Sequence, residues 1–232
     1  MTDGDAATAR WPAAVLFDMD GTLVDSEKVW DVALRELAAE AGGALSAPAR
    51  RAMVGTSMAA SMRILHEDLA QPWRDAAADA EWLEARVHEL FGGGLVWLPG
   101  ARELLAAVRA AGVPAALVTS TGRRLVDVAL DTLGRDSFDV VVCGDEVTAA
   151  KPDPTPYRTA AHLLGVPVGE CVAIEDSPAG VASARAAGAT VLAVPSEIAL
   201  PGAPGVHLRD TLAGVDLAYL AGLLPPSILH PR

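Results

Sequence analysis

Two aspartates lie one residue apart in the sequence VLFDMDGT, residues 15–22, directly after an apolar run. The run has the composition of a buried strand. Because side chains alternate along a strand, Asp18 and Asp20 point the same way while Met19 points back. Two carboxylates that face one group can act as a nucleophile and an acid/base partner. An Asp-x-Asp after a strand also forms turns and helix caps, so the pair alone leaves both roles open.

A hydroxyl pair, Thr119 and Ser120, follows a second apolar run at residues 115–118. A hydroxyl at the end of a strand can donate a hydrogen bond to a phosphate oxygen. It can also cap the helix that follows, and the segment taken alone favours that second role.

Lysine is rare in this chain. It occurs only at Lys28 and Lys151, although Lys and Arg together number 18. Lys151 begins the sequence KPDP, in which two prolines stiffen the backbone and fix the position of a compact point charge. Chance is an alternative explanation for a single residue.

Two adjacent acids, Glu175 and Asp176, end a third apolar run in VAIEDSPAG, residues 172–180. Hard carboxylate oxygens of this kind suit Mg²⁺. Asp176 alone could also cap the next helix. With Asp18 and Asp20 at a neighbouring strand end, however, four uncompensated acids would repel one another, which favours a bound cation.

Beyond residue 98 the sequence alternates between strand-like and helix-like stretches. Strands are predicted at 114–119, 140–143, 171–175 and 190–194, and helices at 99–111, 123–133, 156–164 and 179–187. Glycines at 112, 134, 165 and 188 follow the helices, as is typical of left-handed C-caps. This alternation predicts an α/β fold with a doubly wound parallel sheet. Since parallel strands end at one edge, the four candidate segments are expected to meet there.

Residues 26–94 contain no strand pattern. Helices are predicted at 27–41, 59–69 and 75–91, the first with Ser26 as its N-cap. We therefore expect a catalytic core formed by residues 11–25 and 95–232, with a helical domain at 26–94 inserted into it. The Gly92-Gly93-Gly94 stretch is a candidate hinge between the two, although a loop without function is an alternative.

The composition narrows the class of protein. With 232 residues and 51% hydrophobic content, the chain can bury a sizeable core. The net charge of −12 argues against a nucleic-acid or anionic-membrane partner. Cys143 and Cys171 lie in apolar runs without metal-ligand spacing, which suggests reduced core residues. The first ten residues lack the pattern of a secretory signal and no long apolar run occurs, so we expect a cytoplasmic protein.

Taken together, the four segments resemble the motifs of the haloacid dehalogenase (HAD) superfamily of phosphohydrolases. The matching elements are VLFDMDGTLVDS at 15–26, Thr119 after a strand, Lys151 before Pro-x-Pro, and the acids of VAIEDSPAG. The resemblance implies a Rossmann-like core. The place of the insertion matches the branch with a small helical cap, which contains phosphoglycolate phosphatases, sugar phosphatases and β-phosphoglucomutase.

The resemblance implies catalytic roles for Asp18 and Asp20. Asp18 would attack phosphorus to give an aspartyl-phosphate, while Asp20 would protonate the leaving group and then activate water. A phosphomonoester dianion beside these acids creates an excess of negative charge, which favours a protonated Asp20 and requires cations. A metal-free enzyme is therefore expected to be nearly inactive.

The resemblance also implies the binding residues. Thr119, with the backbone amide of Ser120, and Lys151 would bind the transferring phosphoryl group. Mg²⁺ would be held by Asp18, by the backbone carbonyl of Asp20 and by Asp176, with Glu175 as a direct or an indirect ligand. The expected partner is a small phosphorylated metabolite, most simply a sugar or polyol phosphate.

Two alternatives remain beside the phosphatase. β-Phosphoglucomutase carries a histidine and a phosphate-binding arginine where this chain has Trp30 and Met58, which weakens the mutase interpretation. A catalytically inactive binding protein would usually have lost one of the acids or the lysine, and all are present here.

The residues that contact the rest of the substrate are left open by the sequence. Trp30, Gly55, Thr56 and Ser57 are candidates in the inserted domain. Arg123 and Arg124, just beyond Thr119, could contact substrate or lie on a solvated helix.

Overall fold

The computed structural model describes residues 11–54, 56–195, 200 and 202–225. Within them, parallel strands form one sheet in the order β3-β2-β1-β4-β5-β6. The strands are β1 (Ala14–Phe17), β2 (Ala115–Val118), β3 (Val140–Val142), β4 (Cys171–Glu175), β5 (Thr190–Ala193) and β6 (Val206–Leu208). The chain builds outward from β1 in both directions, so the sheet is doubly wound, as predicted.

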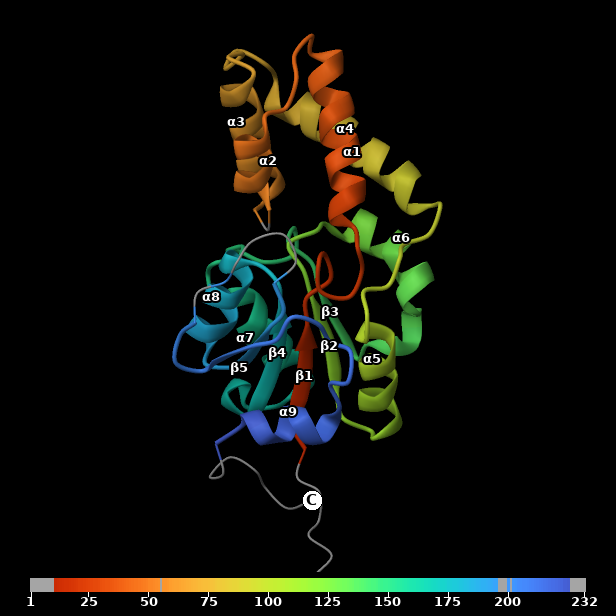
Figure 1. Cartoon of the computed structure of the whole chain (residues 1–232), viewed down its shortest axis with the longest axis vertical. Coiled ribbons are helices and arrows are strands. Elements are labelled where there is room, and N and C mark those ends of the chain that lie inside the picture. The colour runs from red at the N-terminus through yellow and green to blue at the C-terminus, as the bar shows by residue number, and fades with distance from the viewer. Residues whose placement is uncertain (1–10, 55, 196–199, 201, 226–232) are drawn as a thin grey trace, which may run out of the picture.

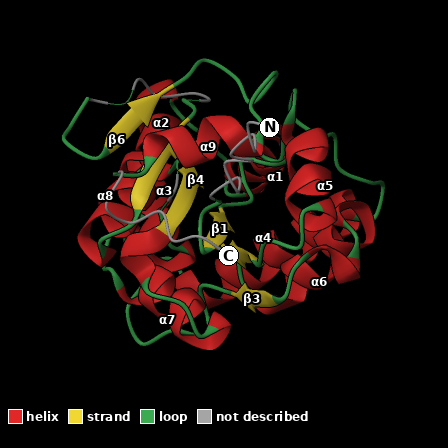
Figure 2. Ribbon diagram, turned by 90° about the horizontal axis from the view of Figure 1, so that it is seen from below, coloured by secondary structure: helices red, strands yellow, loops and turns green. Residues whose placement is uncertain are grey.

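Helices cover both faces of the sheet, because its strands are apolar on both sides. Beyond residue 100 the helices are α5 (Ala101–Ala110), α6 (Arg123–Leu133), α7 (Thr155–Leu164), α8 (Pro178–Ala187) and α9 (Leu217–Leu223). Val15 and Phe17 of β1 belong to the cluster that includes α5 and α6, whereas Ala14 and Leu16 belong to the cluster that includes α7 and α8. Figures 1 and 2 show these two pairs of helices on opposite sides of the sheet, and α9 lies at the lower end of the sheet in Figure 1.

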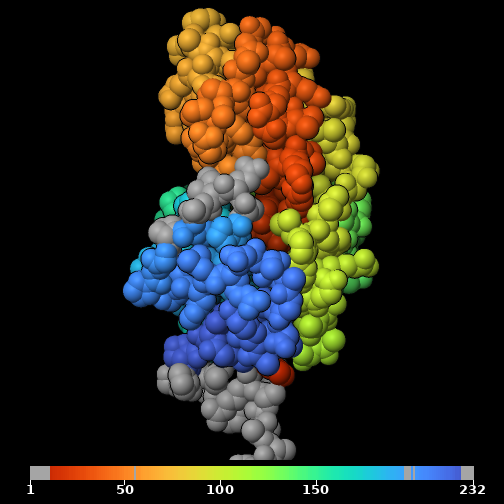
Figure 3. All heavy atoms as spheres, viewed as in Figure 1, coloured from red at the N-terminus to blue at the C-terminus, as the bar shows by residue number. Residues whose placement is uncertain are grey.

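Four helices form a separate lobe beyond the carboxyl ends of the strands, at the top of Figures 1 and 3. They are α1 (Glu27–Glu40), α2 (Ala47–Met53), α3 (Met58–Asp68) and α4 (Ala76–Phe91). Leu34, Met62 and Leu83 are buried between these helices. We call residues 26–94 the cap and the remaining described residues the core, and we propose that these are the two structural units of the chain.

The two crossings between core and cap run side by side. The amide of Asp25 donates to the carbonyl of Val96 at 2.8 Å, and the amide of Leu98 donates to the carbonyl of Leu23 at 2.9 Å. Gly94, which precedes the second crossing, has a φ of +90°, a value that favours glycine. A hinge at this point stays a prediction.

The predicted strands and helices are confirmed, with shifts of at most two residues at their ends. Three short elements, α2, β6 and α9, were not predicted from the sequence. Each has only three to seven residues, too few to show a clear periodicity. Gly112, Gly134, Gly165 and Gly188 all have positive φ, as expected for residues that end helices.

Two further expectations concern the cysteines and membrane-spanning segments. Cys143 and Cys171 are both free thiols in the buried core. Among the described residues, no helix combines the length and the apolar character needed to span a membrane. The cytoplasmic location stays a prediction.

Candidate active site

A cavity of about 330 Å³ lies between the carboxyl ends of the strands and the cap. β1, β2 and β4 are parallel, so their carboxyl ends lie at the same edge of the sheet, on the side of the cap (Figure 1). Most of the predicted site residues line this cavity, namely Asp18, Asp20, Ser120, Lys151 and Asp176. Thr119 and Glu175 are not among its lining residues and are almost inaccessible, at 2% and 0% exposure.

Lys151 lies between two carboxylates from different strand ends. Its Nζ donates to Asp18 Oδ1 at 2.7 Å and to Glu175 Oε1 at 2.6 Å, and also to the carbonyl of Val118 at 2.9 Å. Burial alone would lower the pKa of this lysine, but the negative charges of Asp18 and Glu175 outweigh burial and raise it. The ammonium group therefore stays charged and holds the two strand ends together.

Glu175 is held by protein donors on both of its oxygens. Oε1 also accepts from the Tyr157 hydroxyl at 2.6 Å, while Oε2 accepts from the Ser177 hydroxyl at 3.2 Å and from the Asp176 amide at 3.2 Å. Its carboxylate lies against α8 at Gly180, where an added Cβ would come within 2.0 Å of the carboxylate. Glycine is required there because any side chain would displace Glu175.

Three carboxylates come close enough to share a cation. Ligand oxygens of Asp18, Glu175 and Asp176 all lie within 4.8 Å of one another, and each residue is buried. Burial is the main cause that raises the pKa of Asp18 to about 7, against the opposing charge of Lys151. The three carboxylates supply only oxygen ligands, and their combined negative charge exceeds the positive charge of Lys151. Such a donor set fits Mg²⁺.

Asp20 is hydrogen-bonded on both oxygens. Oδ1 accepts from the Ser26 hydroxyl at 2.5 Å and from Trp30 Nε1 at 3.4 Å. Oδ2 accepts from the hydroxyls of Thr119 at 3.2 Å and Thr121 at 2.8 Å. Ser26 is the N-cap residue of α1, as expected, but its side chain makes no capping hydrogen bond, because its hydroxyl donates to Asp20.

The two hydroxyl residues after β2, Thr119 and Ser120, differ in their position relative to the cavity. Thr119 Oγ1 accepts from the Thr121 amide at 3.0 Å and bonds Asp20, which places it behind the cavity. Ser120 lines the cavity, and Gly144 packs so closely against it that an added Cβ would lie 2.1 Å from the Ser120 carbonyl oxygen. Contact of either residue with phosphate stays a prediction.

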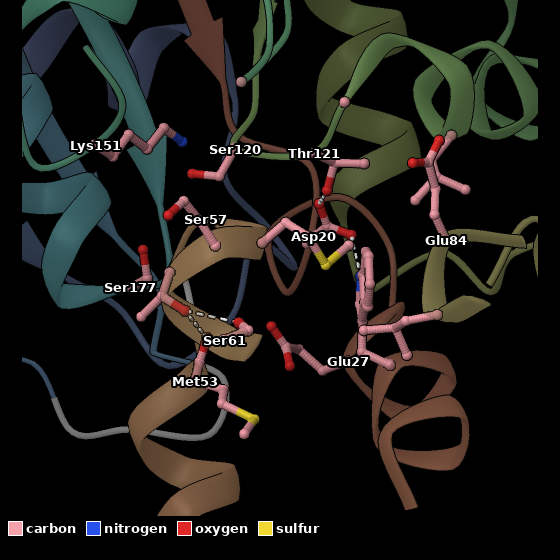
Figure 4. Close-up of a pocket in the computed structure, with 18 of the residues that line it drawn as sticks. Asp20, Glu27, Met53, Ser57, Ser61, Glu84, Ser120, Thr121, Lys151 and Ser177 are labelled. Carbon is pink, nitrogen blue, oxygen red and sulfur yellow. Dashed lines mark hydrogen bonds between the residues drawn. The ribbon is translucent and has the colours of Figure 1, made fainter. Parts of the chain in front are cut away.

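The cap supplies the opposite wall of the cavity. Trp30, Thr56 and Ser57, proposed from the sequence as candidates, all line it, and so does Met58. In Figure 4, Ser57 on the cap lies across from Ser120 and Lys151 on the core. Gly55, the fourth candidate, falls outside the described residues.

The two arginines after Thr119 have partners on the protein. Arg123 Nε donates to Glu146 Oε1 at 2.7 Å, and Arg123 Nη2 donates to the carbonyl of Val141 at 3.0 Å. Arg124 lies 3.8 Å from Glu84 of the cap, across the boundary between core and cap. Neither arginine lines the cavity, which favours the structural role; contact with substrate stays untested.

Several cavity residues were missed by sequence reasoning. Thr121 follows the hydroxyl pair directly and could have been found from its position. Glu27, Arg50, Glu84 and Asp145 also line the cavity, but they occur at ordinary positions in helices and a loop. No local pattern distinguishes them from surface charges.

Comparisons with known proteins agree with this geometry. A family model described as haloacid dehalogenase-like hydrolase matches residues 12–188. The phosphoglycolate phosphatase of Cupriavidus necator is 36% identical, over 97% of this chain and 99% of its own length. Hexitol phosphatase A of Escherichia coli is 36% identical, over 75% and 81% of the two chains. The β-phosphoglucomutase structure from Clostridium difficile superposes with a TM-score of 0.78 at 21% identity, covering 91% of this chain and 96% of its own, which shows a shared fold.

Proposed function

Because this chain belongs to the haloacid dehalogenase-like hydrolases and is a phosphatase, we propose that it hydrolyses small sugar or polyol phosphomonoesters with Mg²⁺. The reaction would pass through an aspartyl-phosphate on Asp18. The observation that supports this most directly is the group of Asp18, Asp176 and Lys151 at the floor of a cavity closed by the cap. The cytoplasmic location is part of the same proposal.

Electrostatic attraction would determine where the phosphoryl group of the substrate binds. Lys151, fixed by Asp18 and Glu175, would draw the phosphoryl group to the floor of the cavity, and Ser120 would contact one of its oxygens. Asp18 and Asp176, with the backbone carbonyl of Asp20, would hold Mg²⁺. When bound, the ion would offset the charge that accumulates between acids and phosphate.

The chemical steps use two carboxylates. An oxygen of Asp18 attacks phosphorus, the bond to the ester oxygen breaks, and that oxygen takes a proton from Asp20. Asp20 then removes a proton from water, whose oxygen attacks the phosphorus of the aspartyl-phosphate. Inorganic phosphate leaves and Asp18 is restored. The hydroxyls of Ser26 and Thr121 can donate to or accept from Asp20, so they can hold it in either protonation state.

Glu175 would act on the metal site indirectly, through its contact with Lys151. Both of its oxygens already accept hydrogen bonds from protein donors, which favours a role as an indirect ligand that positions Lys151. Thr119 would act in the same way on Asp20, and would reach phosphate only if its hydroxyl leaves that carboxylate.

The test is phosphate release from a panel of sugar, polyol, glycolate and nucleotide monophosphates. With Mg²⁺ we expect turnover that EDTA abolishes and that the Asp18→Asn variant lacks, although its circular dichroism shows that it is folded. In an Asp20→Asn variant the second step is slowed, and mass spectrometry should find one phosphoryl group on Asp18. Normal turnover by a folded Asp18→Asn variant would refute the mechanism.

A mutase is the second candidate, and the shared fold with β-phosphoglucomutase is what favours it. Against it, Trp30 and Met58 line the cavity at the two positions where the mutase carries its histidine and arginine. Isomerisation of β-glucose 1-phosphate without phosphate release would favour the mutase. No reaction with any compound would favour a binding protein.

A further inference from the structure

Further charged side chains line the cavity besides the predicted site residues. Among the described residues they are three acids and one arginine, Glu27, Glu84, Asp145 and Arg50. In Figure 4, Glu27 and Glu84 lie on the side of the cavity away from Lys151, and the carboxylate of Glu27 points into the cavity. A substrate held by its phosphoryl group at Lys151 would direct its other end toward Glu27 and Glu84.

Arg50, the cation of this group, is already paired. Its Nη2 donates to Glu27 Oε2 at 2.6 Å and to the Glu27 carbonyl at 3.0 Å, and its Nε lies 3.3 Å from Asp31 Oδ1. Arg50 and Glu27 are only 6% and 8% exposed. A buried arginine at a cavity wall would ordinarily attract an anionic substrate group, but here two carboxylates offset its charge.

The N-terminus of α6 is the second feature that would ordinarily attract an anion. The Asp145 carboxylate already occupies it, since Oδ1 and Oδ2 lie 3.0 and 3.2 Å from the Arg123 amide nitrogen. In the described lining of the cavity, these two features are therefore neutralised by the protein's own acids. Glu84 of the cap adds a further carboxylate to the lining, 3.8 Å from Arg124 of the core.

Hydroxyl groups make up much of the remaining polar surface. Ser57 and Ser61 on the cap and Ser120 and Thr121 on the core line the cavity. Hydroxyls donate and accept hydrogen bonds, so they match the hydroxyls of a polyol or sugar.

We propose that this cavity selects phosphomonoesters whose other end is uncharged and hydroxylated, and that it rejects those that carry a second anionic group. Glu27 and Asp145 are the specificity-determining residues, because each neutralises a feature that would otherwise attract an anion. The inference rests on the proposed phosphatase activity and narrows its substrate class. The proposed selectivity would favour a hexitol phosphate over phosphoglycolate, which carries a carboxylate.

The test compares two substrates of equal length, glucitol 6-phosphate and 6-phosphogluconate, which differ at the far end by a hydroxymethyl group against a carboxylate. With Mg²⁺, we expect kcat/KM for glucitol 6-phosphate to exceed that for 6-phosphogluconate by about tenfold or more, the size of a close like-charge repulsion. p-Nitrophenyl phosphate is the reference for the chemistry itself. If it is hydrolysed but the two hexose derivatives are equally good, the selectivity proposal is wrong and the phosphatase proposal stands.

Charge-removing variants test the two residues. Glu27→Gln and Asp145→Asn should each raise the ratio of kcat/KM for 6-phosphogluconate to that for glucitol 6-phosphate by about fivefold, because each removes one negative charge from the wall. Asp145 is exposed, so its variant tests the proposal even if Glu27→Gln does not fold. Glu36→Gln is the matched control, since Glu36 lies on the same helix as Glu27, pairs with Arg86 at 2.6 Å and does not line the cavity.

The outcomes are distinct. An increase with Glu27→Gln or Asp145→Asn, but not with Glu36→Gln, supports the proposal. Equal changes in all three variants would show a general effect of net charge, and no change in any would remove the assigned role; either result overturns it.

Discussion

In the core, one lysine joins carboxylates from two strands, whereas in the cap the buried charges tie neighbouring helices to each other. Lys151 contacts Asp18 after β1 and Glu175 at the end of β4. In the cap, Arg50 of α2 pairs with Glu27 of α1, and Asp79 of α4 pairs with His66 of α3. A substitution in the core cluster should therefore disturb several strand ends and the chemistry at once. A substitution in the cap should alter stability or selection and leave the chemistry in place.

The Lys151→Met variant should show the largest effect. It removes the cation that offsets Asp18 and Glu175, so we expect phosphate release to fall by about a thousandfold. The buried carboxylates left behind should lower the free energy of unfolding by about 3 kcal/mol. Steady-state kinetics and urea unfolding measure the two effects, and a variant with near-normal turnover would contradict the role given to the core cluster.

Gly180→Ala tests the same cluster without changing any charge. The new Cβ would overlap the Glu175 carboxylate, which must move and carry Lys151 with it. We expect a loss of about 2 kcal/mol in unfolding free energy and a fall in kcat of about a hundredfold. Gly202→Ala is the control, because no atom lies within 4 Å of an added Cβ there. Unchanged kcat would mean that the position of Glu175 does not matter.

Asp79→Asn should affect the stability of the cap. Hydrogen bonds from Arg74, aided by His66, hold the pKa of Asp79 below its usual range despite burial. At neutral pH the variant should lose about 2 kcal/mol of unfolding free energy, because a charge-assisted pair is broken. The kcat for p-nitrophenyl phosphate should change little.

The pH dependence of this loss has a definite sign. A carboxyl whose pKa is lower in the folded state stabilises the protein above its ordinary pKa, near 3.8, and loses this contribution as pH falls through the folded value. The difference between wild type and Asp79→Asn should therefore shrink below about pH 4, as thermal unfolding at several pH values would measure. A constant difference would contradict the ion-pair explanation. Glu89→Gln, on the same helix, is an exposed control.

Arg124→Gln should have the smallest effect. Arg124 and Glu84 approach across the boundary between core and cap, but they are 3.8 Å apart and the arginine side chain is 57% exposed. Such a pair contributes less than about 0.5 kcal/mol. We expect unfolding and kcat/KM for a neutral substrate to stay within about twofold of wild type. A large loss of kcat/KM would mean that this pair holds the cap over the cavity.

The sequence was sufficient for the fold and for the location of the candidate site. The alternation of apolar strands and amphipathic helices predicts the doubly wound sheet, and the inserted helical segment is visible where the alternation stops. Asp18, Ser120, Lys151 and Asp176 could be placed at one cavity because parallel strands end at the same edge, whatever their order in the sheet. Short elements such as α2 and β6 were not predicted, because three to seven residues are too few to show a clear periodicity.

Only the tertiary structure decided what each polar group contacts. Thr119 and Glu175 lie at the predicted strand ends, yet their side chains bond Asp20 and Lys151 behind the cavity. Glu27 and Arg50 are 23 residues apart, and their pairing depends on how two helices pack and on their rotation about their own axes. Backbone hydrogen bonds within the sheet set the positions of the strand ends, and the pattern of apolar residues in the sequence predicts those positions. The partners of a helical side chain depend on packing between helices, which local periodicity does not encode.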